Sequence, residues 1–470
     1  MEKFDAIIIG SGQAGNPLAK KLSGEGMRVA LVESAFIGGT CINNGCTPTK
    51  TLVGVAKIIV QAHRAEKYGI TISNDALNYE TINQWKDKVV ADFRKGLENS
   101  LAQDPNITLL RGEGRFSGYK EIRVQLEGSS HKSIAAESIF INTGARPRIP
   151  EIEGLQSVNF LTSKTILELD CIPKHLLIVG GGYIALEFSQ IFRRMGSQVT
   201  IIEKSPRLLP KEDNDVGLIV SQILEMEGVQ IITDATVRQV STDNNESINI
   251  NVLSKQQSIT LSGSHLLIAT GRAPNTEDLD LPKTGIQVDD MGYIAVNGQL
   301  ETTEPGIYAL GDVKGGPAFT HVSYHDFIVV ADHLFGKKAS STHNRLIPYC
   351  LFIDPELGRI GLTEKDASEK GLDYSVAKMK TSFIARAFET GETTGFIKAI
   401  VDNKTKRILG VAVICPGAGE LMSLLQMAML GNLTYDQLRD TIFAHPTYAE
   451  SINNLFSAKN IQPGIKSYHL

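Results

Sequence analysis

A short buried strand that runs into a glycine-rich turn is the feature that most limits how this chain folds. The strand is predicted over residues 6–9, and after the turn come a helical segment and a second strand that ends at Glu33. Gly10 allows the tight bend, Gly12 lets the backbone approach a pyrophosphate, and Gly15 lets helix and strand pack closely. Glu33, eighteen residues past Gly15, can accept hydrogen bonds from an adenosine ribose. This spacing predicts a βαβ unit that binds a dinucleotide.

The same arrangement returns in the middle of the chain. A strand predicted over residues 176–179 leads into a second glycine-rich turn, and the next strand ends at Glu203, again eighteen residues past the last small residue of the turn. The small residues of this turn are Gly180, Gly182 and Ala185. Two copies at one spacing are hard to obtain by chance, so we predict two dinucleotide sites. Glu203 would repel a 2′-phosphate, which favours NADH over NADPH, although Lys204 and Arg207 weaken that preference.

Length and composition indicate an ordinary globular protein with more than one domain. A chain of 470 residues exceeds what one hydrophobic core holds, and 42% apolar with 21% charged residues is typical of globular proteins. The net charge of -5 gives no support to nucleic-acid binding, and no apolar run reaches the length of a membrane span. The N-terminus lacks the apolar core of a signal peptide, so we expect a cytoplasmic enzyme.

Cys41 and Cys46, with four residues between them, are predicted to form a dithiol that opens and closes. In a straight helix such a pair is separated by roughly 7.5 Å of axial rise, whereas a disulfide needs Cα atoms within about 7 Å. The helix must therefore be distorted, and Gly45 tolerates distortion. The alternatives are two unrelated buried thiols or a zinc site, but zinc needs about four ligands, so no metal site is predicted. The other cysteines, predicted to be buried free thiols, are Cys171, Cys350 and Cys415.

Further elements are predicted along the chain. The segments 141–147 and 268–275 echo each other, because each is a strand that runs into a glycine turn and a proline, and we interpret them as crossings between domains. Residues past about 457 are polar and are predicted to be loose. The remaining predicted elements are helices over 51–63, 79–102 and 419–430 and strands over 359–362 and 396–401.

Together these motifs resemble the FAD-dependent class I pyridine nucleotide–disulfide oxidoreductases, a family that includes lipoamide dehydrogenase, glutathione reductase and mercuric reductase. The similarity runs from about residue 4 to about residue 456. It implies an α/β fold with two Rossmann-like dinucleotide-binding domains and a C-terminal α+β dimerisation domain. The implied segments are 1–148 and 276–344 for FAD, 149–275 for NAD(P)H and 345–470 for the dimer interface.

The resemblance also implies which residues contact the cofactors. Gly114 matches the family's adenine-side turn, and Asp312 would bond the ribityl chain of the flavin. The residues implied for FAD are Gly10, Gly12, Gly15, Glu33, Thr40, Lys50, Gly114, Thr143, Gly144, Asp312, Phe319, Thr320 and His321. The residues implied for NAD(P)H, with NADH favoured, are Gly180, Gly182, Tyr183, Ala185, Glu187, Glu203 and Gly271.

By the same resemblance, a nicotinamide gives hydride to the flavin, and the reduced flavin opens the Cys41–Cys46 bond. Cys46 would lie against the flavin, and Cys41 would attack the substrate as a thiolate. Lys50 would stabilise the reduced pair, with Glu187 as its ion-pair partner, although an acid early in a helix is also favoured by the helix dipole. Tyr183 resembles the aromatic ring that covers the flavin until nicotinamide displaces it, and ordinary packing is the alternative.

The resemblance also implies a catalytic base near the C-terminus. His445, in the sequence His-Pro-Thr, would exchange a proton with Cys41, and a histidine's unperturbed pKa of about 6.5 suits that role. Glu450 would orient the ring and raise its basicity. In the family this histidine reaches the dithiol of the partner subunit, so the active unit would be a homodimer. The His445–Pro446 bond is a candidate cis peptide.

The sequence leaves three functions open, which differ in what receives the electrons. A lipoamide-like disulfide or dithiol fits the retained His445 and is placed first. Reduction of mercuric or cupric ions is the alternative, since the segment 38–50 resembles a branch of metal-reducing stress flavoproteins. Against mercury, the chain has no vicinal cysteine pair near residue 470 and no N-terminal metal-carrying domain is seen. A flavin-bound redox sensor with little turnover is a third possibility.

Overall fold

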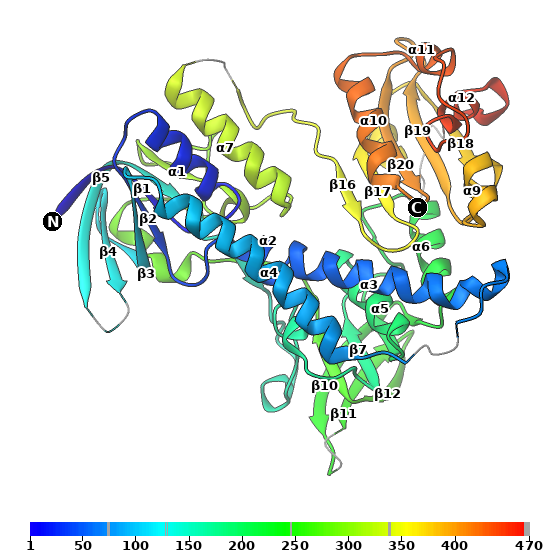
Figure 1. Ribbon diagram of the computed structural model, residues 1–470, viewed down its shortest axis with the longest axis horizontal. Coiled ribbons are helices and arrows are strands. Elements are labelled where there is room, and N and C mark those ends of the chain that lie inside the picture. Colours follow the sequence, from blue (N-terminus) through cyan, green and yellow to red (C-terminus); the bar gives the residue numbers. More distant parts are fainter. Residues whose placement is uncertain (73–75, 127, 129, 245–246, 337–339, 465–470) are drawn as a thin grey trace.

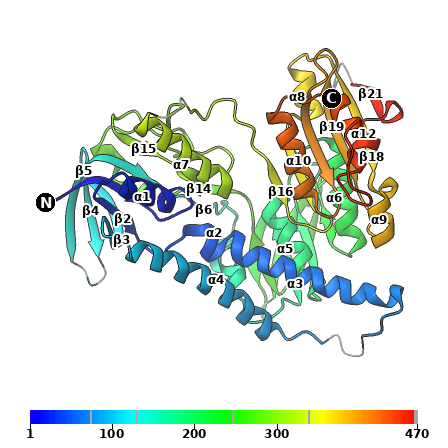
Figure 2. The same ribbon diagram turned by 45° about the horizontal axis from the view of Figure 1, so that its top comes forward.

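The computed structural model describes residues 1–72, 76–126, 128, 130–244, 247–336 and 340–464 (Figure 1). It is an α/β protein in which a sheet near each end of the chain flanks a central, mainly parallel unit. Two long helices cross the middle of the molecule, and the C-terminal sheet lies apart from the N-terminal one in both ribbon views (Figures 1 and 2). This arrangement confirms the predicted fold class.

The N-terminal sheet contains the first fingerprint. Its strands are β1 (Glu2–Ile9), β2 (Val29–Glu33), β3 (Ile107–Gly118), β4 (Glu121–Leu126), β5 (His131–Ile141) and β15 (Ile307–Ala309). Ile7 and Ile8 of β1 are completely buried, because β1 pairs in parallel with both β2 and β5 and is covered on both faces. The helices α1 (Gly15–Gly24) and α7 (Thr320–Phe335) pack together on one face. Since β15 pairs with β5, the chain returns to this sheet late in its course.

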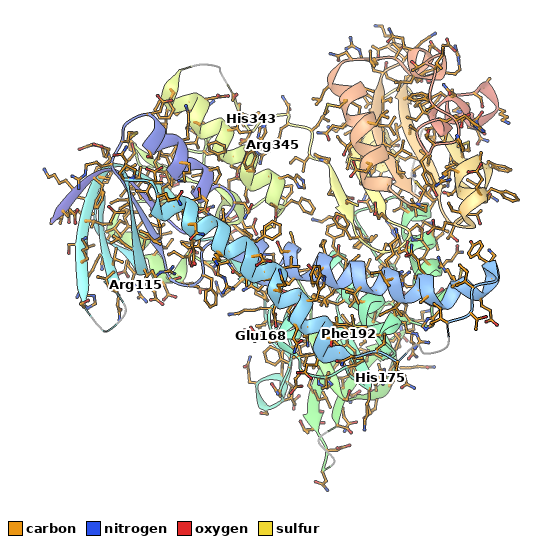
Figure 3. The ribbon with its side chains drawn as sticks, in the orientation of Figure 1. Arg115, Glu168, His175, Phe192, His343 and Arg345 are labelled. Atoms are coloured by element: carbon orange, nitrogen blue, oxygen red, sulfur yellow. The ribbon has the colours of Figure 1, made fainter. Side chains whose placement is uncertain are left out.

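The central unit repeats this design around the second fingerprint. Its parallel sheet has the order β13 (His265–Ile268), β7 (His175–Val179), β8 (Gln198–Ile202) and β9 (Gln230–Ile232). Its helices are α5 (Tyr183–Arg194) and α6 (Asn214–Met226), and an antiparallel sheet adds β10 (Ala235–Thr242), β11 (Ile248–Ser254) and β12 (Gln257–Gly263). Figure 3 marks His175 on β7 and Phe192 on α5, where the Phe192 ring is fully buried in the core. The strand predicted over 176–179 and the strand predicted to lead to Glu203 are therefore confirmed as β7 and β8.

The C-terminal sheet is antiparallel, with strand order β16-β17-β20-β19-β18-β21. Its strands are β16 (Tyr349–Leu351), β17 (Leu357–Gly361), β18 (Tyr374–Lys380), β19 (Phe396–Asp402), β20 (Ile408–Ile414) and β21 (Ile461–Pro463). Its helices are α8 (Glu364–Glu369), α9 (Ala385–Thr390), α10 (Ala418–Leu430), α11 (Tyr435–Arg439) and α12 (Ser451–Leu455). The short 3-10 turns of the chain are 65–68, 155–157, 165–168, 277–279, 281–283, 311–314, 381–383 and 458–460.

Three helices lie between the first two strands of the N-terminal sheet and strand β3, and the first two of them contain Cys41 and Cys46. They are α2 (Gly39–Asn44), α3 (Cys46–Arg64) and α4 (Tyr79–Ala102). The buried Leu52 and Ala56 of α3 belong to the same core as residues of α5, so α3 packs against the central unit. Asn78 caps α4 by accepting from the Thr81 N–H at 3.0 Å. The helix predicted over 79–102 is confirmed, whereas the helix predicted over 51–63 begins earlier, because Pro48 is tolerated in a first turn.

The two echoing segments pair with each other. The short strands β6 (Ala145–Pro147) and β14 (Arg272–Pro274) form an antiparallel ribbon (Figure 2). Gly144 and Gly271, which precede the two strands, have φ of 70° and 110°, values that favour glycine. The chain thus passes from the first unit to the second and back through one paired crossing.

Three expectations were wrong. Cys171 is exposed and Cys350 is half-buried, because neither lies on an inward-facing core position, while Cys415 is buried as predicted. Gly114 lies inside strand β3 and not in a turn, since β3 continues from its parallel pairing with β2 into an antiparallel pairing with β4. Residues past 457 are not loose throughout, because β21 pairs with β18; residues 465–470 lie outside the described residues.

Among the helices described, none combines the length and the apolar character that crossing a membrane requires.

Candidate active site

Cys41 lies within α2 and Cys46 begins α3, and Gly45 alone separates the two helices. Gly45, with φ of −142° and ψ of −115°, ends α2 and starts α3, which is the distortion that the spacing predicts. A Cβ on Gly45 would lie 2.7 Å from the Thr40 carbonyl oxygen, so a larger residue does not fit. Both cysteines are free thiols in this structure. Cys46 is the first residue of α3, where the helix dipole favours a thiolate.

The polar groups around Cys46 favour its charged form. The hydrogen bond from the Cys41 thiol, together with the Thr320 hydroxyl and the charge of Lys50, lowers the pKa of Cys46 to about 6. The Thr320 Oγ1 lies 3.3 Å from the Cys46 Sγ. Because Cys41 is the donor in this pair, the pKa of Cys41 is raised. A thiolate at Cys46 near neutral pH is what thiol–disulfide exchange requires.

Lys50 and Glu187 join the cysteine helix to the second fingerprint helix. Lys50 Nζ lies 2.7 Å from Glu187 Oε2, and the Glu187 side chain is only 6% exposed. The other oxygen, Oε1, accepts from the Phe352 N–H at 3.0 Å, and Lys50 Nζ lies 5.0 Å from the centre of the Phe352 ring. The carboxylate of Glu187 is therefore satisfied on both oxygens, which identifies it as an ion-pair partner and not only an acid early in a helix.

Aromatic rings from three segments meet beside this ion pair. Tyr183 begins α5, Phe319 precedes α7 and Tyr349 begins β16; the centroid of the Tyr183 ring lies 6.1 Å from Phe319 and 5.3 Å from Tyr349. Burial raises the pKa of Tyr183 to about 12. His321 stacks on Phe319 with 5.3 Å between centroids and donates from Nε2 to the Pro348 carbonyl oxygen at 2.6 Å. Thr320, which contacts Cys46, directly follows Phe319, so the chain places this group of rings next to the dithiol.

The two fingerprint turns have the close backbone packing that a dinucleotide site requires. A Cβ on Gly10 would lie 2.3 Å from the Asn142 carbonyl oxygen, and one on Gly15 would lie 2.2 Å from the Gly10 oxygen. At the second turn a Cβ on Gly180 would lie 2.5 Å from the Ala269 oxygen, whereas Gly182 has open space where a Cβ would be. At Gly10, Gly15 and Gly180 the surrounding backbone leaves no room for a side chain, so the backbone there can approach a pyrophosphate as FAD and NAD(P)H require.

Glu33 and Glu203 are held in the same way. Glu33 accepts from the Ser11 N–H at 2.8 Å and from the Ala35 N–H at 2.8 Å. Glu203 accepts from the Gly181 N–H at 2.6 Å and from the Ser205 N–H at 2.7 Å. Each carboxylate is thereby fixed at the end of its strand, where a ribose is bound in this type of unit.

Other residues of the predicted cofactor sites line the same region. The carboxylate of Asp312 lies 3.6 Å from Arg272 Nε, and burial raises the pKa of Asp312. The hydroxyl of Thr143 donates to the Asn275 carbonyl oxygen at 2.8 Å, on the crossing that carries Gly144 and Gly271. Figure 3 marks Arg345 on the segment that leads from α7 to β16. Thr40 lies on α2, one residue before Cys41, and Ala185 is buried in the first turn of α5.

Sequence reasoning missed four residues of this site. Asn142 accepts from the Gly15 N–H at 2.9 Å and donates to the Leu310 oxygen at 2.9 Å, and its place just before the first crossing was a usable signal. The others are Arg272, Tyr349 and Phe352, whose nearness to the site depends on chain segments that meet only in the folded protein.

His445 and Glu450 form a separate pair on the C-terminal unit. Glu450 Oε2 lies 2.8 Å from His445 Nδ1, the His445 side chain is 67% exposed, and the His445–Pro446 peptide is cis as predicted. Within the described part of the chain, no hydrogen bond or ion pair joins His445 to either Cys41 or Cys46. In both ribbon views α12, which follows Glu450, lies apart from α2 (Figures 1 and 2).

Comparison with known proteins agrees with this geometry. Residues 4–326 match the family described as pyridine nucleotide-disulphide oxidoreductase, and residues 347–456 match its dimerisation domain, which indicates a homodimer. The chain is 40% identical to the probable pyridine nucleotide-disulfide oxidoreductase RclA of Escherichia coli (strain K12), covering 97% of this chain and 99% of that one. A solved Cu(II) complex of that protein, described as an HOCl-induced flavoprotein disulfide reductase, superposes with a TM-score of 0.89 at 39% identity, covering 97% of this chain and 99% of that chain.

Two other relatives have different names. A mercuric reductase of Staphylococcus aureus is 33% identical over 96% of this chain and 81% of its own length. A dihydrolipoyl dehydrogenase of Thermus scotoductus is 34% identical over 96% of both chains. The chain therefore belongs to the pyridine nucleotide–disulphide oxidoreductase family, and it is an FAD-dependent flavoprotein disulfide reductase that takes electrons from NAD(P)H.

Proposed function

We propose that this enzyme passes electrons from NADH to a small or protein-bound disulfide through the Cys41–Cys46 pair. The observation that carries the proposal is the position of Cys46, which begins a helix beside Thr320 and is tied through Lys50 to Glu187 of the second fingerprint helix. One set of side chains thereby connects the dithiol with both dinucleotide units. Bound FAD supplies two-electron transfer between the nicotinamide and the dithiol.

The residues proposed to hold the cofactors lie at the two fingerprint turns, at the crossing between the units and on neighbouring elements. For FAD they are Gly10, Gly12, Gly15, Glu33, Thr40, Lys50, Gly114, Thr143, Gly144, Asp312, Phe319, Thr320 and His321. For NAD(P)H they are Gly180, Gly182, Tyr183, Ala185, Glu187, Glu203 and Gly271. The support is the backbone crowding at Gly10 and Gly180, which leaves room only for glycine.

We propose a preference for NADH because Glu203 would repel a 2′-phosphate and because Arg207 already donates hydrogen bonds within its own loop. Arg207 NH2 donates to the carbonyl oxygens of Pro210 and Glu212, at 3.2 Å each, so its guanidinium braces its own loop. It is therefore less available to a 2′-phosphate than the sequence alone suggests. Lys204 is exposed and can still weaken the preference.

The sulfur chemistry follows from the different surroundings of the two thiols. Cys41, once deprotonated, attacks one sulfur of the substrate disulfide and releases the first product thiolate, which leaves a mixed disulfide. The Cys46 thiolate then attacks the Cys41 sulfur, closes the Cys41–Cys46 bond and releases the second thiolate. His445 of the partner subunit takes the Cys41 proton and returns it to a leaving thiolate, with Glu450 orienting the ring. The 67% exposure of His445 supports a role across the subunit interface.

Reduction of Cu(II) is a second candidate. A solved relative at 39% identity is a Cu(II) complex, and paired thiolates suit a copper ion as it becomes Cu(I). In this reaction the dithiol closes to a disulfide, gives one electron to each of two Cu(II) ions and loses its protons to solvent. Mercuric reduction is supported by the names of relatives, one of them at 33% identity, and by the resemblance of segment 38–50.

We also propose how the chain divides into units and where the protein is located. The division into segments 1–148, 149–275, 276–344 and 345–470 is supported by the crossing at β6 and β14 and by the return of β15 to the first sheet. A cytoplasmic location is proposed from the low cysteine content, since five cysteines in 470 residues do not form a secreted disulfide framework.

The test is a panel of acceptors offered to the FAD-loaded enzyme. NADH and NADPH oxidation are followed in parallel with lipoamide, glutathione disulfide, Cu(II) and Hg(II), and the Cys41→Ser and Cys46→Ser variants serve as controls. Turnover with lipoamide or another disulfide that both variants abolish supports the proposal. Turnover only with Cu(II) establishes the second candidate, and no turnover with any acceptor points to a redox sensor.

A further inference from the structure

Tyr349 joins the C-terminal sheet to a loop of the central unit that is 137 positions away in the sequence. On β16 it lies directly opposite Arg359 of β17 in the sheet register. Its hydroxyl donates to one carboxylate oxygen of Glu212, and Arg359 Nε donates to the other at 3.0 Å. Glu212 comes from the loop between β8 and α6, and its side chain is buried together with that of Arg359. The carboxylate thus bridges two adjacent strands of the C-terminal sheet and fixes the position of the Tyr349 ring.

The Tyr349 ring is one of two surfaces against which Tyr183 packs. Tyr349 and Phe319 are stacked, with 5.6 Å between centroids and 12° between planes. Tyr183 is tilted against both rings, at 43° to Tyr349 and 39° to Phe319. Since Tyr183 also begins the second fingerprint helix, these three rings occupy the junction of the two dinucleotide units.

The three rings are not held equally. Tyr349 is fixed by its strand and by Glu212, and Phe319 is backed by the stacked ring of His321. For Tyr183, by contrast, no hydrogen bond of the phenol hydroxyl is found within the described residues. Within the described residues, Tyr183 can therefore leave the cluster without breaking a hydrogen bond of its hydroxyl, whereas Tyr349 cannot.

We propose that Tyr349, anchored by Glu212, is a positioning residue that holds Tyr183 over the junction and so sets the affinity for the nicotinamide half of the dinucleotide. This inference rests on the proposed function, with Tyr183 taken, as the family resemblance implies, to cover the flavin until nicotinamide displaces it. Contacts between aromatic rings stabilise the covering position. Removing one of its two supports increases the fraction of protein in which Tyr183 is displaced, and the apparent Kd falls as that fraction rises.

The test measures binding of NAD⁺ to the oxidised, FAD-loaded protein by calorimetry, with ADP-ribose as the matched ligand that lacks nicotinamide. We expect Tyr349→Ala to tighten NAD⁺ binding by about 2- to 10-fold and to leave ADP-ribose unchanged. Tyr349→Phe, which keeps the ring and loses the bond to Glu212, shifts NAD⁺ binding in the same direction by a smaller factor. The control Tyr119→Phe, which loses a hydroxyl bond to the Pro305 oxygen, changes neither ligand.

A double-mutant cycle ties the effect to Tyr183. In a Tyr183→Ala background, Tyr349→Ala changes the affinity for NAD⁺ less than about two-fold, because the ring that Tyr349 holds is gone. Unchanged or weaker NAD⁺ binding in both Tyr349 variants, with ADP-ribose bound normally, overturns the inference and leaves the proposed function intact. A wild-type protein that binds neither ligand overturns both. The conservative Tyr349→Phe keeps the test valid if the alanine variant fails to fold.

Discussion

Lys50 Nζ and Glu187 Oε2 lie 2.7 Å apart, which joins the helix that begins at Cys46 to the helix of the second dinucleotide fingerprint. The two charges act in opposite directions on the nearby thiol, because Lys50 lowers and Glu187 raises the pKa of Cys46. The pair therefore adjusts how much Cys46 thiolate exists at neutral pH. It also fixes the orientation of α3 against α5, on which the geometry of the dithiol depends.

The first prediction uses these opposite signs. We expect Lys50→Met to raise the pKa of Cys46 by about one unit and Glu187→Gln to lower it, since each removes one charge. In the wild-type reduced protein the first thiol proton is lost near pH 6, so alkylation of Cys46 by iodoacetamide is slow below that pH and fast above it. The measurement is the pH dependence of the alkylation rate, resolved by mass spectrometry. A shift in the same direction for both variants would contradict the assignment.

The second prediction concerns the hydroxyl of Thr320, 3.3 Å from the Cys46 Sγ. Thr320→Val removes this hydrogen bond to the thiolate, so the pKa of Cys46 rises and less thiolate is present at pH 7. Thr320→Ser keeps the hydroxyl and is the matched control. The same alkylation profile measures both variants, and equal profiles for valine and serine would show that the hydroxyl does not stabilise the thiolate.

The third prediction tests whether His445 is the base in the reaction with the disulfide substrate. His445→Ala slows reoxidation by a disulfide substrate by roughly 10²- to 10⁴-fold, and Glu450→Gln slows it less, because the ring remains in place. NADH-driven reduction of the enzyme stays near the wild-type rate in both. The measurement is stopped-flow kinetics of each half-reaction.

Mixed dimers decide which subunit supplies the base. A dimer of one Cys41→Ser subunit and one His445→Ala subunit contains one intact site only if His445 serves the partner's dithiol. Recovery of disulfide turnover on mixing the two inactive variants supports that assignment. If His445 serves its own subunit, no intact site forms and mixing restores nothing.

The fourth prediction concerns the choice of nicotinamide cofactor. Glu203 accepts from two backbone N–H groups, and we propose that it binds the ribose of the nicotinamide cofactor, where it would oppose a 2′-phosphate. Glu203→Ala lowers kcat/KM for NADH and raises the relative value for NADPH, moving the ratio by about tenfold for each 1.4 kcal/mol lost. Glu225→Ala, on the exposed side of α6, is the control. An unchanged ratio would show that specificity lies elsewhere in the site.

The fifth prediction concerns the buried amine of Lys398. Its Nζ lies 2.8 Å from Asp213, 2.7 Å from Asp215 and 2.9 Å from Glu364, and its side chain is 2% exposed. Lys398→Met leaves these carboxylates without their central cation and costs about 3–5 kcal/mol of unfolding free energy. Urea unfolding measures the loss, and Lys365→Met, an exposed lysine 3.8 Å from Glu369, is expected to change little.

The same cluster predicts an acid sensitivity. Burial would raise the pKa of Asp215, but Lys398 and Lys378 hold it below its usual value. A carboxyl with a lowered folded pKa contributes stability above its unfolded pKa of about 3.9, and that contribution is lost as pH falls through the folded pKa. We therefore expect wild-type stability to fall below about pH 4, and Asp215→Asn to show a shallower fall. Identical pH profiles would contradict the role of Asp215.

The sequence alone determined the local features of this protein. Both βαβ units, the broken helix at Gly45 and helix α4 follow from short-range rules, because glycine spacing, apolar periodicity and strand-ending acids act within a few turns of the chain. The resemblance supplied the proposed roles of Cys41, Cys46 and His445. The sequence also misplaced Gly114, since it cannot show that one strand changes partners from β2 to β4.

Only the tertiary structure decided which distant side chains meet. Tyr349 and Glu212 are 137 positions apart and Lys398 and Asp213 are 185 apart, and no local pattern encodes such contacts. Their partners are chosen by the packing of the C-terminal sheet against the central unit, where burial makes unpaired charges costly and so fixes which groups pair. The local sequence builds the dinucleotide sites and the dithiol; the packing of three units determines what surrounds them.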